Sequence, residues 1–357
     1  AASDYIFEID NCPNLEVSGV RGLKDSGGDS TTGYGFLLVD GSDGIGVSGI
    51  QIVGTNVNAF YYGIHAVCRV ILDEIDINQL YDGISSRGVF FDTGSDDSSL
   101  AGFAIRGFAD NLYVGDAVEF VTVANGVCRG RSTTRGHDCR FNSVHFEDTI
   151  TIGEPGIGPD YRVNNSFNGC HYSGSISGRQ GRATFSGCHM EPNSLQFVRF
   201  HSDMTNAILT GCAFRPGVAS GGPPSPINAV ASMVYFECPG SVVGCIQYDN
   251  PVEQQATWAY IRFAAGAEGV IANNTFMSIN GAATRTGSLI DVSAVSDENV
   301  AIANNVCDAP AGATIGTNGI TVSGTANTVV TITGNIMPTI TVSGLVPVNR
   351  SNNIPAP

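Results

Sequence analysis

Three of the chain's six histidines occur at matching places in a repeated sequence phrase, and glutamates accompany two of them. His145 and His189 are each followed two residues later by a carboxylate, Glu147 and Glu191, and His171 lies between them. Paired carboxylates are the groups with which most glycosidases work, one as the acid and the other activating water. Histidines beside them could bind sugar hydroxyls or titrate near neutral pH. The candidate chemistry is therefore hydrolysis of an extended, hydroxyl-rich polymer.

We predict Glu147 and Glu191 as the catalytic pair. The predicted substrate contacts are the side chains expected on the same outward strip: His145, His171, His189, Arg106, Arg215 and Asp76. The two glutamates fall two repeats apart, which is about 10 Å at the spacing of neighbouring strands. Converging side chains could bring the carboxyls to the roughly 6.5–9.5 Å that an inverting glycosidase requires. Neither a Cys-x-x-Cys nor a His-spaced zinc pattern is present, so we expect no metal and no cofactor.

Two other functions fit the same strip. In β-elimination on a uronate polymer, His171 or a nearby tyrosine would abstract the proton, and an arginine would neutralise the carboxylate. A non-enzymatic spike would hold the glycan without cutting it. The sequence also leaves rival acidic groups open: Asp73, Glu74 and Asp76, then Asp92, Asp96 and Asp97, and finally Asp160, Tyr161 and Asp203 in loops.

The elements that position these residues follow from the phrase itself. Examples are Leu100–Ile105, Phe185–Met190 and Ile302–Cys307, in which apolar residues flank a hinge that is Gly, Asn or Ser in eleven of twelve copies. A repeat of this kind, with β-favouring runs and almost no helical periodicity, is typical of a stacked solenoid. We predict an all-β fold, a single-stranded right-handed parallel β-helix of about 12 coils.

Two columns of residues are expected inside this solenoid. Asn274, Asn305 and Asn335 occupy one equivalent position and predict an internal amide ladder. Four cysteines share the inward position of successive coils, and we favour reduced, stacked thiols over disulfides; they are Cys170, Cys188, Cys212 and Cys245. The 41-residue step from Phe103 to Val144 holds material beyond a minimal coil.

Composition narrows the function classes. The chain has 357 residues and a net charge of −16, which disfavours binding to the phosphate backbone of nucleic acids. No apolar run is long enough to span a membrane as a helix, so no membrane insertion is expected. The repeats favour one domain over residues 1–357, with core coils at about 10–350. Because the chain starts at Ala1 without a leader, we expect it to be excised from a longer protein.

The repeated phrases, the mixed Asn and Cys interior and the scarcity of helix signals resemble bacteriophage tailspike proteins of the parallel β-helix type. The resemblance covers nearly the whole chain and is architectural, because tailspikes share a shape and little sequence. It implies a homotrimer in the extracellular virion tail that binds and cleaves a bacterial surface polysaccharide, capsule or O-antigen. Pectate-lyase-like enzymes share the architecture, but their calcium-binding aspartate cluster beside a catalytic arginine is not evident here.

Overall fold

The computed structural model is all-β, and its described part contains no helix. The described residues are 5–10, 15–19, 23–24, 34–39, 50–59, 62–79, 86–153, 163–191, 198–215, 232–249, 259–264, 266–278, 288–293, 299–308, 319–324, 329–344 and 348–355. Two compact units divide the chain: Ala1–Ile157 with Tyr161–His171, and Gly158–Asp160 with Tyr172–Pro357. Each unit is a right-handed parallel β-helix, which confirms the predicted fold class.

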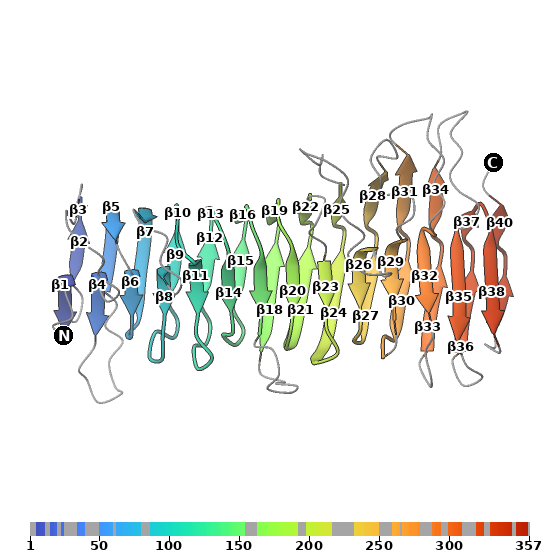
Figure 1. Cartoon of the computed structure of the whole chain (residues 1–357), viewed down its shortest axis with the longest axis horizontal. Helices are drawn as coiled ribbons and strands as arrows, with labels where there is room; N and C mark the ends of the chain where they lie inside the picture. The colour runs from blue at the N-terminus through green and yellow to red at the C-terminus, as the bar shows by residue number, and fades with distance from the viewer. Residues whose placement is uncertain are drawn as a thin grey trace. The chain divides into compact units, whose positions relative to one another are not determined.

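In the first unit, one parallel sheet consists of β1 (Tyr5–Asp10), β4 (Tyr34–Val39), β6 (Tyr62–Ala66), β8 (Arg87–Phe91), β11 (Asp110–Val114), β14 (Ser132–Thr134) and β17 (Ile150–Ile152). Figure 1 shows β8, β11 and β14 side by side, as their register requires. The remaining strands form the second ladder: β2 (Glu16–Ser18), β3 (Leu23–Lys24), β5 (Ile50–Ala59), β7 (Val70–Gln79), β9 (Ser99–Ala101), β10 (Ala104–Arg106), β12 (Thr122–Ala124), β13 (Val127–Arg129), β15 (Arg140–Asn142), β16 (His145–Phe146) and β18 (Asn164–Asn168). The boundary between the units falls within β19 (His171–Tyr172).

The second unit repeats this plan. Its first sheet consists of β20 (Ile176–Gly178), β23 (Val198–Phe200), β26 (Ser232–Phe236), β29 (Ala259–Phe263), β32 (Ile290–Ser293), β35 (Ile320–Gly324) and β38 (Ile340–Gly344). The second ladder contains β21 (Gly181–Ser186), β22 (His189–Met190), β24 (Met204–Thr210), β25 (Ala213–Phe214), β27 (Gly240–Val243), β28 (Ile246–Asp249), β30 (Gly269–Ala272), β31 (Thr275–Ser278), β33 (Asn299–Ala303), β34 (Val306–Asp308), β36 (Val329–Thr333), β37 (Ile336–Met337), β39 (Val348–Ser351) and β40 (Ile354–Pro355).

The predicted hinge is a residue in the left-handed backbone region. Gly102, for example, separates β9 from β10 of the second ladder with φ of +59°, whereas Glu74 lies within the continuous strand β7. Ser143, Asn273 and Asn304 adopt the same conformation, which Gly and Asn accept more readily than other residues. Glu74, with φ of +53°, is the one hinge outside the Gly, Asn and Ser set that the sequence phrase contains. The described hinges therefore place a left-handed residue at the same point of the repeated phrase.

Apolar side chains stack inside each unit. In the first unit, the rings of Phe141 and Phe167 lie 4.7 Å apart and nearly parallel. In the second, Phe200, Phe236 and Phe263 follow one another at centroid distances of 5.0 and 4.7 Å. Because side chains alternate between the two faces of a strand, each buried column leaves an outward column free for polar residues.

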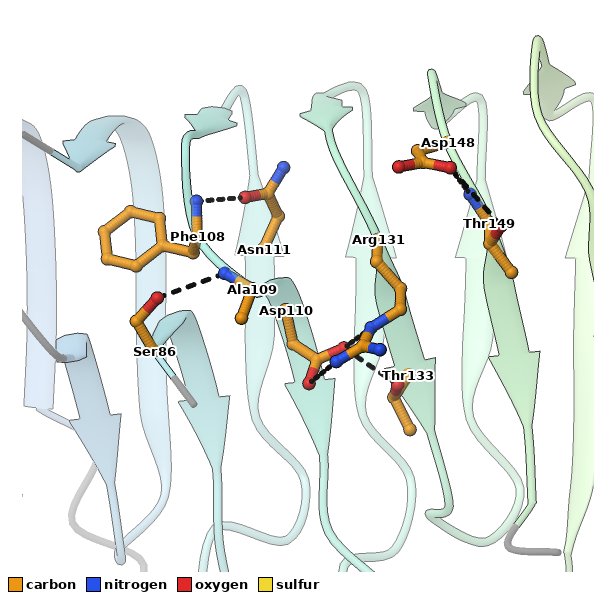
Figure 2. Close-up of polar contacts among 9 residues, drawn as sticks. All are labelled: Ser86, Phe108, Ala109, Asp110, Asn111, Arg131, Thr133, Asp148 and Thr149. Atoms are coloured by element: carbon orange, nitrogen blue, oxygen red, sulfur yellow. Dashed lines mark hydrogen bonds and ion pairs between the residues drawn. The ribbon is translucent and has the colours of Figure 1, made fainter. Parts of the chain in front are cut away.

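Polar contacts between coils fix the turns of the first unit. Figure 2 shows the Arg131 guanidinium facing the Asp110 carboxylate, with Nε donating at 2.8 Å and Nη2 at 3.2 Å. The Thr133 hydroxyl donates to the same carboxylate at 3.1 Å, and this hydrogen-bonded carboxylate raises the pKa of Arg131. Nearby, the buried Asn111 side chain accepts from the Phe108 N–H at 3.1 Å. The contacts of Asp110 with Arg131 and Thr133 tie β11 to the next coil, in which β14 is its partner in the first sheet.

Candidate functional site

The predicted strip begins on the second ladder of the first unit. Asp76 and Arg106 lie on β7 and β10, and Asp76 Oδ1 is 3.7 Å from Arg106 Nη2. Both side chains are exposed, so this ion pair contributes little stability. Their register places Ala104 beside Asp76 and Arg106 beside Asn78, as the sequence pattern predicts.

A coil that the phrase did not identify lies between Arg106 and Glu147. The 41-residue step contains β12, β13 and β14, in which Asn125 is the left-handed hinge and Gly126 holds the position after it. The side chain expected there is absent, because a Cβ at Gly126 would overlap the Phe103 ring. This coil brings Arg129 into the strip, with its Nε 3.3 Å from Glu147 Oε1.

Two of the predicted histidines stack on each other in the first unit. The rings of His145 and His171 have centroids 4.4 Å apart and planes 12° apart. The backbone positions them, because the His171 N–H donates to the Val144 carbonyl at 2.9 Å. His145 lies in register with Val127, so the inserted coil separates it from Ala104.

The remaining predicted residues form a cluster in the second unit. Glu191 Oε1 lies 3.3 Å from His189 Nε2 and 3.8 Å from Arg215 Nη1. The Arg215 N–H donates to the Met190 carbonyl at 2.9 Å, which places the arginine one coil beyond Glu191. Glu147 and Glu191, the predicted catalytic pair, thus belong to different units, and each has its own arginine partner.

The rival acidic groups have separate surroundings. Asp92 Oδ2 contacts His65 Nε2 at 3.0 Å, and Asp96 Oδ1 accepts from the Glu119 N–H at 2.8 Å. Asp73 accepts from the N–H of its neighbour Glu74. Asp160 and Tyr161 lie outside the described residues. Asp203 acts electrostatically on His201, which belongs to a different cluster.

That cluster lies on the first sheet of the second unit, and sequence reasoning missed it. Arg199, Tyr235, Arg262 and Asp291 occupy one outward column in register on β23, β26, β29 and β32. His201 and Glu237 each follow two residues after a member of this column. We call these six residues the Tyr235 cluster: Arg199, His201, Tyr235, Glu237, Arg262 and Asp291.

One end of the Tyr235 cluster is organised by Glu237. Arg199 Nη2 donates to the two carboxylate oxygens of Glu237 at 2.8 and 3.0 Å, and its Nε donates at 3.3 Å. His201 Nδ1 lies 3.4 Å from the same carboxylate. Burial, together with Arg199 and Arg179, nevertheless lowers the pKa of His201 to about 4. His201 is therefore neutral at pH 7.

The other end of the cluster holds Asp291, whose carboxyl is partly buried beside Arg262. Asp291 Oδ2 lies 3.5 Å from Arg262 Nε, and the Asp291 side chain is 20% exposed. Burial raises the pKa of Asp291, and the neighbouring Arg262 only partly opposes this shift. Burial and the adjacent Glu237 also raise the pKa of Tyr235. Groups whose environments move their pKa values apart are typical of acid–base sites.

The sequence does carry a signal for this cluster, in a second phrase of alternating apolar residues. It reads Val198-Arg199-Phe200-His201, Val234-Tyr235-Phe236-Glu237, Ile261-Arg262-Phe263 and Ile290-Asp291-Val292. The hinge phrase lies only on the second ladder, so it does not predict the outward residues of the first sheet.

The chain was compared with models of protein families, with curated proteins and with solved structures, and nothing matched in any of the three. Among the described residues, no helix is long and apolar enough to cross a membrane.

Proposed function

We propose that this chain binds an extended glycan on its outward strand faces and depolymerises it by hydrolysis. The observation that carries the proposal is Asp291, a partly buried carboxyl with a raised pKa inside the Tyr235 cluster. A raised pKa is what glycosidic cleavage requires of the carboxyl that acts as its general acid.

In this mechanism, Asp291 protonates the oxygen that leaves with the cleaved sugar. The second carboxylate is Glu237, which accepts two hydrogen bonds from Arg199 Nη2. From strand spacing and rise per residue, the Cα atoms of Glu237 and Asp291 are about 12 Å apart. Side chains that converge on a substrate can shorten this separation to the roughly 6.5–9.5 Å of an inverting pair. Since Arg199 lies on β23, away from β32, Glu237 must turn toward the substrate to do so.

Glu147 and Glu191 stay the catalytic residues predicted from the sequence. Glu191 is the better placed for acid–base work, because a histidine and an arginine both approach its carboxylate. Comparing its variants with those of Asp291 decides which face of the second unit carries the reaction.

A second candidate reaction, β-elimination, is favoured by one specific observation: Tyr235 lies between two guanidinium groups. Arg199 and Arg262 have their central carbons 5.4 and 6.0 Å from the centre of its ring. Neutral His201 would take the proton α to a uronate carboxylate, and that electron pair would form the C=C bond. The C–O bond to the next sugar would break, and its oxygen would take the Tyr235 proton.

The biological setting follows from the resemblance to tailspikes. We propose a bacterial surface polysaccharide as substrate, a homotrimer as the assembly and the extracellular virion tail as the location. The outward clusters support such a role because they line strand faces along which a polymer can extend.

The test is size-exclusion chromatography of capsular and O-antigen polysaccharides before and after incubation with the protein. Hydrolysis predicts shorter polymer without new absorbance in the near ultraviolet, whereas elimination adds the absorbance of an unsaturated uronate. Asp291→Asn should abolish cleavage, and Asp308→Asn, an exposed carboxylate on β34, should leave it unchanged. Binding without any shortening would replace the depolymerase with a non-cleaving receptor-binding spike.

A further inference from the structure

Two arginines occupy directly paired positions on neighbouring strands of the first unit. Arg106 on β10 is in register with Arg129 on β13, and both side chains are about half exposed, at 45% and 54%. Like charges directly opposite each other on a sheet are destabilising. Such a pair is therefore a place where an anion would be stabilising.

The carboxylates near this pair lie at its two ends. Arg106 contacts Asp76 at 3.7 Å, and Arg129 contacts Glu147 at 3.3 Å. Among the described residues, the structure gives neither guanidinium an acceptor that it shares with the other. Each guanidinium has five N–H donors, so one outer carboxylate leaves donors of both arginines available to a ligand.

We propose that Arg106 and Arg129 form a clamp for one anionic substituent, a carboxylate or a sulfate, of an acidic polysaccharide. Adjacent strands separate the two side-chain origins by about 4.8 Å, so a single oxyanion can accept from both guanidinium groups. The exposed ion pairs at the ends are weak and can be exchanged for ligand contacts at small cost. This inference adds a substrate class to the proposed glycan binding, on which it rests.

Charge gives the clamp its selectivity. The net charge of −16 repels polyanions from the molecule as a whole, so nonspecific attraction does not explain binding of an acidic polymer. A local pair of arginines can reverse this repulsion at one place. Binding of an acidic glycan should then depend on these two residues out of proportion to their share of the total charge.

The experiment measures the affinity of the whole chain for three probes: a polyuronate, the same polymer with its carboxyl groups reduced to alcohols, and a sulfated dextran. Arg106→Gln and Arg129→Gln should each weaken binding of an anionic probe about tenfold, the effect of losing one strong charged contact. Arg140→Gln is the matched control, because Arg140 is also exposed but has Thr122 and Ser166 as its strand neighbours. Circular dichroism and the melting temperature show whether each variant is folded.

The outcomes separate this inference from the proposed function. The clamp is supported if the protein prefers the polyuronate or the sulfated dextran and both Gln variants abolish that preference. The preferred probe then identifies the substituent. If the reduced polymer binds as tightly and the arginine variants change nothing, the clamp is overturned while glycan binding stands. If none of the three probes nor any polysaccharide of the depolymerisation panel binds, both are overturned.

Discussion

Asn274 and Asn305 are joined by a hydrogen bond inside the second unit, in which Asn274 Nδ2 donates to Asn305 Oδ1 at 2.9 Å. Asn305 Nδ2 in turn donates to Asn335 Oδ1 at 2.8 Å, and each amide also reaches a backbone carbonyl. The amide ladder predicted from the sequence is therefore confirmed. At its other end it meets the cysteine column, where the Cys245 N–H donates to Asn274 Oδ1.

Breaking this ladder should destabilise the fold. Asn305→Leu removes the acceptor for the Asn274 N–H and the donor to the Ile271 carbonyl, at a cost of about 2–4 kcal/mol. Asn305→Cys should cost less, because Cys245 Sγ accepts the Cys212 N–H at the equivalent position. Urea unfolding measures both, and equal losses for Leu and Cys would contradict a role for the hydrogen bonds.

Removing a buried polar group should stabilise the same unit. Gln247 is fully buried in register with Phe214 and Phe276, and among the described residues neither its amide nitrogen nor its oxygen has a hydrogen-bond partner. Gln247→Leu is expected to raise the free energy of unfolding by about 1–3 kcal/mol. If urea unfolding instead shows a lower free energy of unfolding for Gln247→Leu, a bound water satisfies the Gln247 amide in the wild type.

Replacing Asp291 should separate activity from stability. Since burial raises its pKa, the folded state holds the proton more tightly than the unfolded state does, and ionised Asp291 destabilises the fold. Asp291→Asn should therefore lose cleavage activity but melt higher than wild type at neutral pH. The difference should shrink as the pH falls through the folded pKa. A lower melting temperature at neutral pH would indicate that contact with Arg262 outweighs burial.

His201 gives an opposite pH dependence. Its pKa is about 4 in the folded state and near 6.5 when unfolded, so the unfolded state takes up the proton first as the pH falls. Wild-type stability should drop by about 3 kcal/mol between pH 6.5 and 4, and His201→Gln should lack this part of the drop. If the free energy of unfolding falls equally with pH in wild type and His201→Gln, the lowered pKa of His201 is contradicted.

The glutamates predicted from the sequence are tested on the same polymer. Glu191→Gln should abolish cleavage without changing the unfolding midpoint if the face of β22 carries the reaction. Glu147→Gln removes the carboxylate partner of Arg129 and should leave the arginine clamp with one fewer carboxylate competing with the ligand. If Glu191→Gln keeps full cleavage activity and Asp291→Asn loses it, catalysis belongs to the Tyr235 cluster.

The hinge phrase predicted the fold because its physical cause is local. A left-handed residue between two short apolar runs, as at Gly102 or Asn304, needs no distant information. The phrase failed at Gly126, where the volume expected from a side chain is filled by Phe103 from the preceding coil. The Tyr235 cluster was not predicted because its members are 92 residues apart along the chain, from Arg199 to Asp291, and only the register of the first sheet brings them together.

Because side chains alternate between the two faces of a strand, the inward and outward residues of this protein form two independent sets. Phe200, Phe236 and Phe263 face inward, whereas Arg199, Tyr235 and Arg262 occupy the intervening outward positions. Substitution of outward residues, one coil at a time, can thus change ligand preference without altering the inward packing that holds the backbone in place.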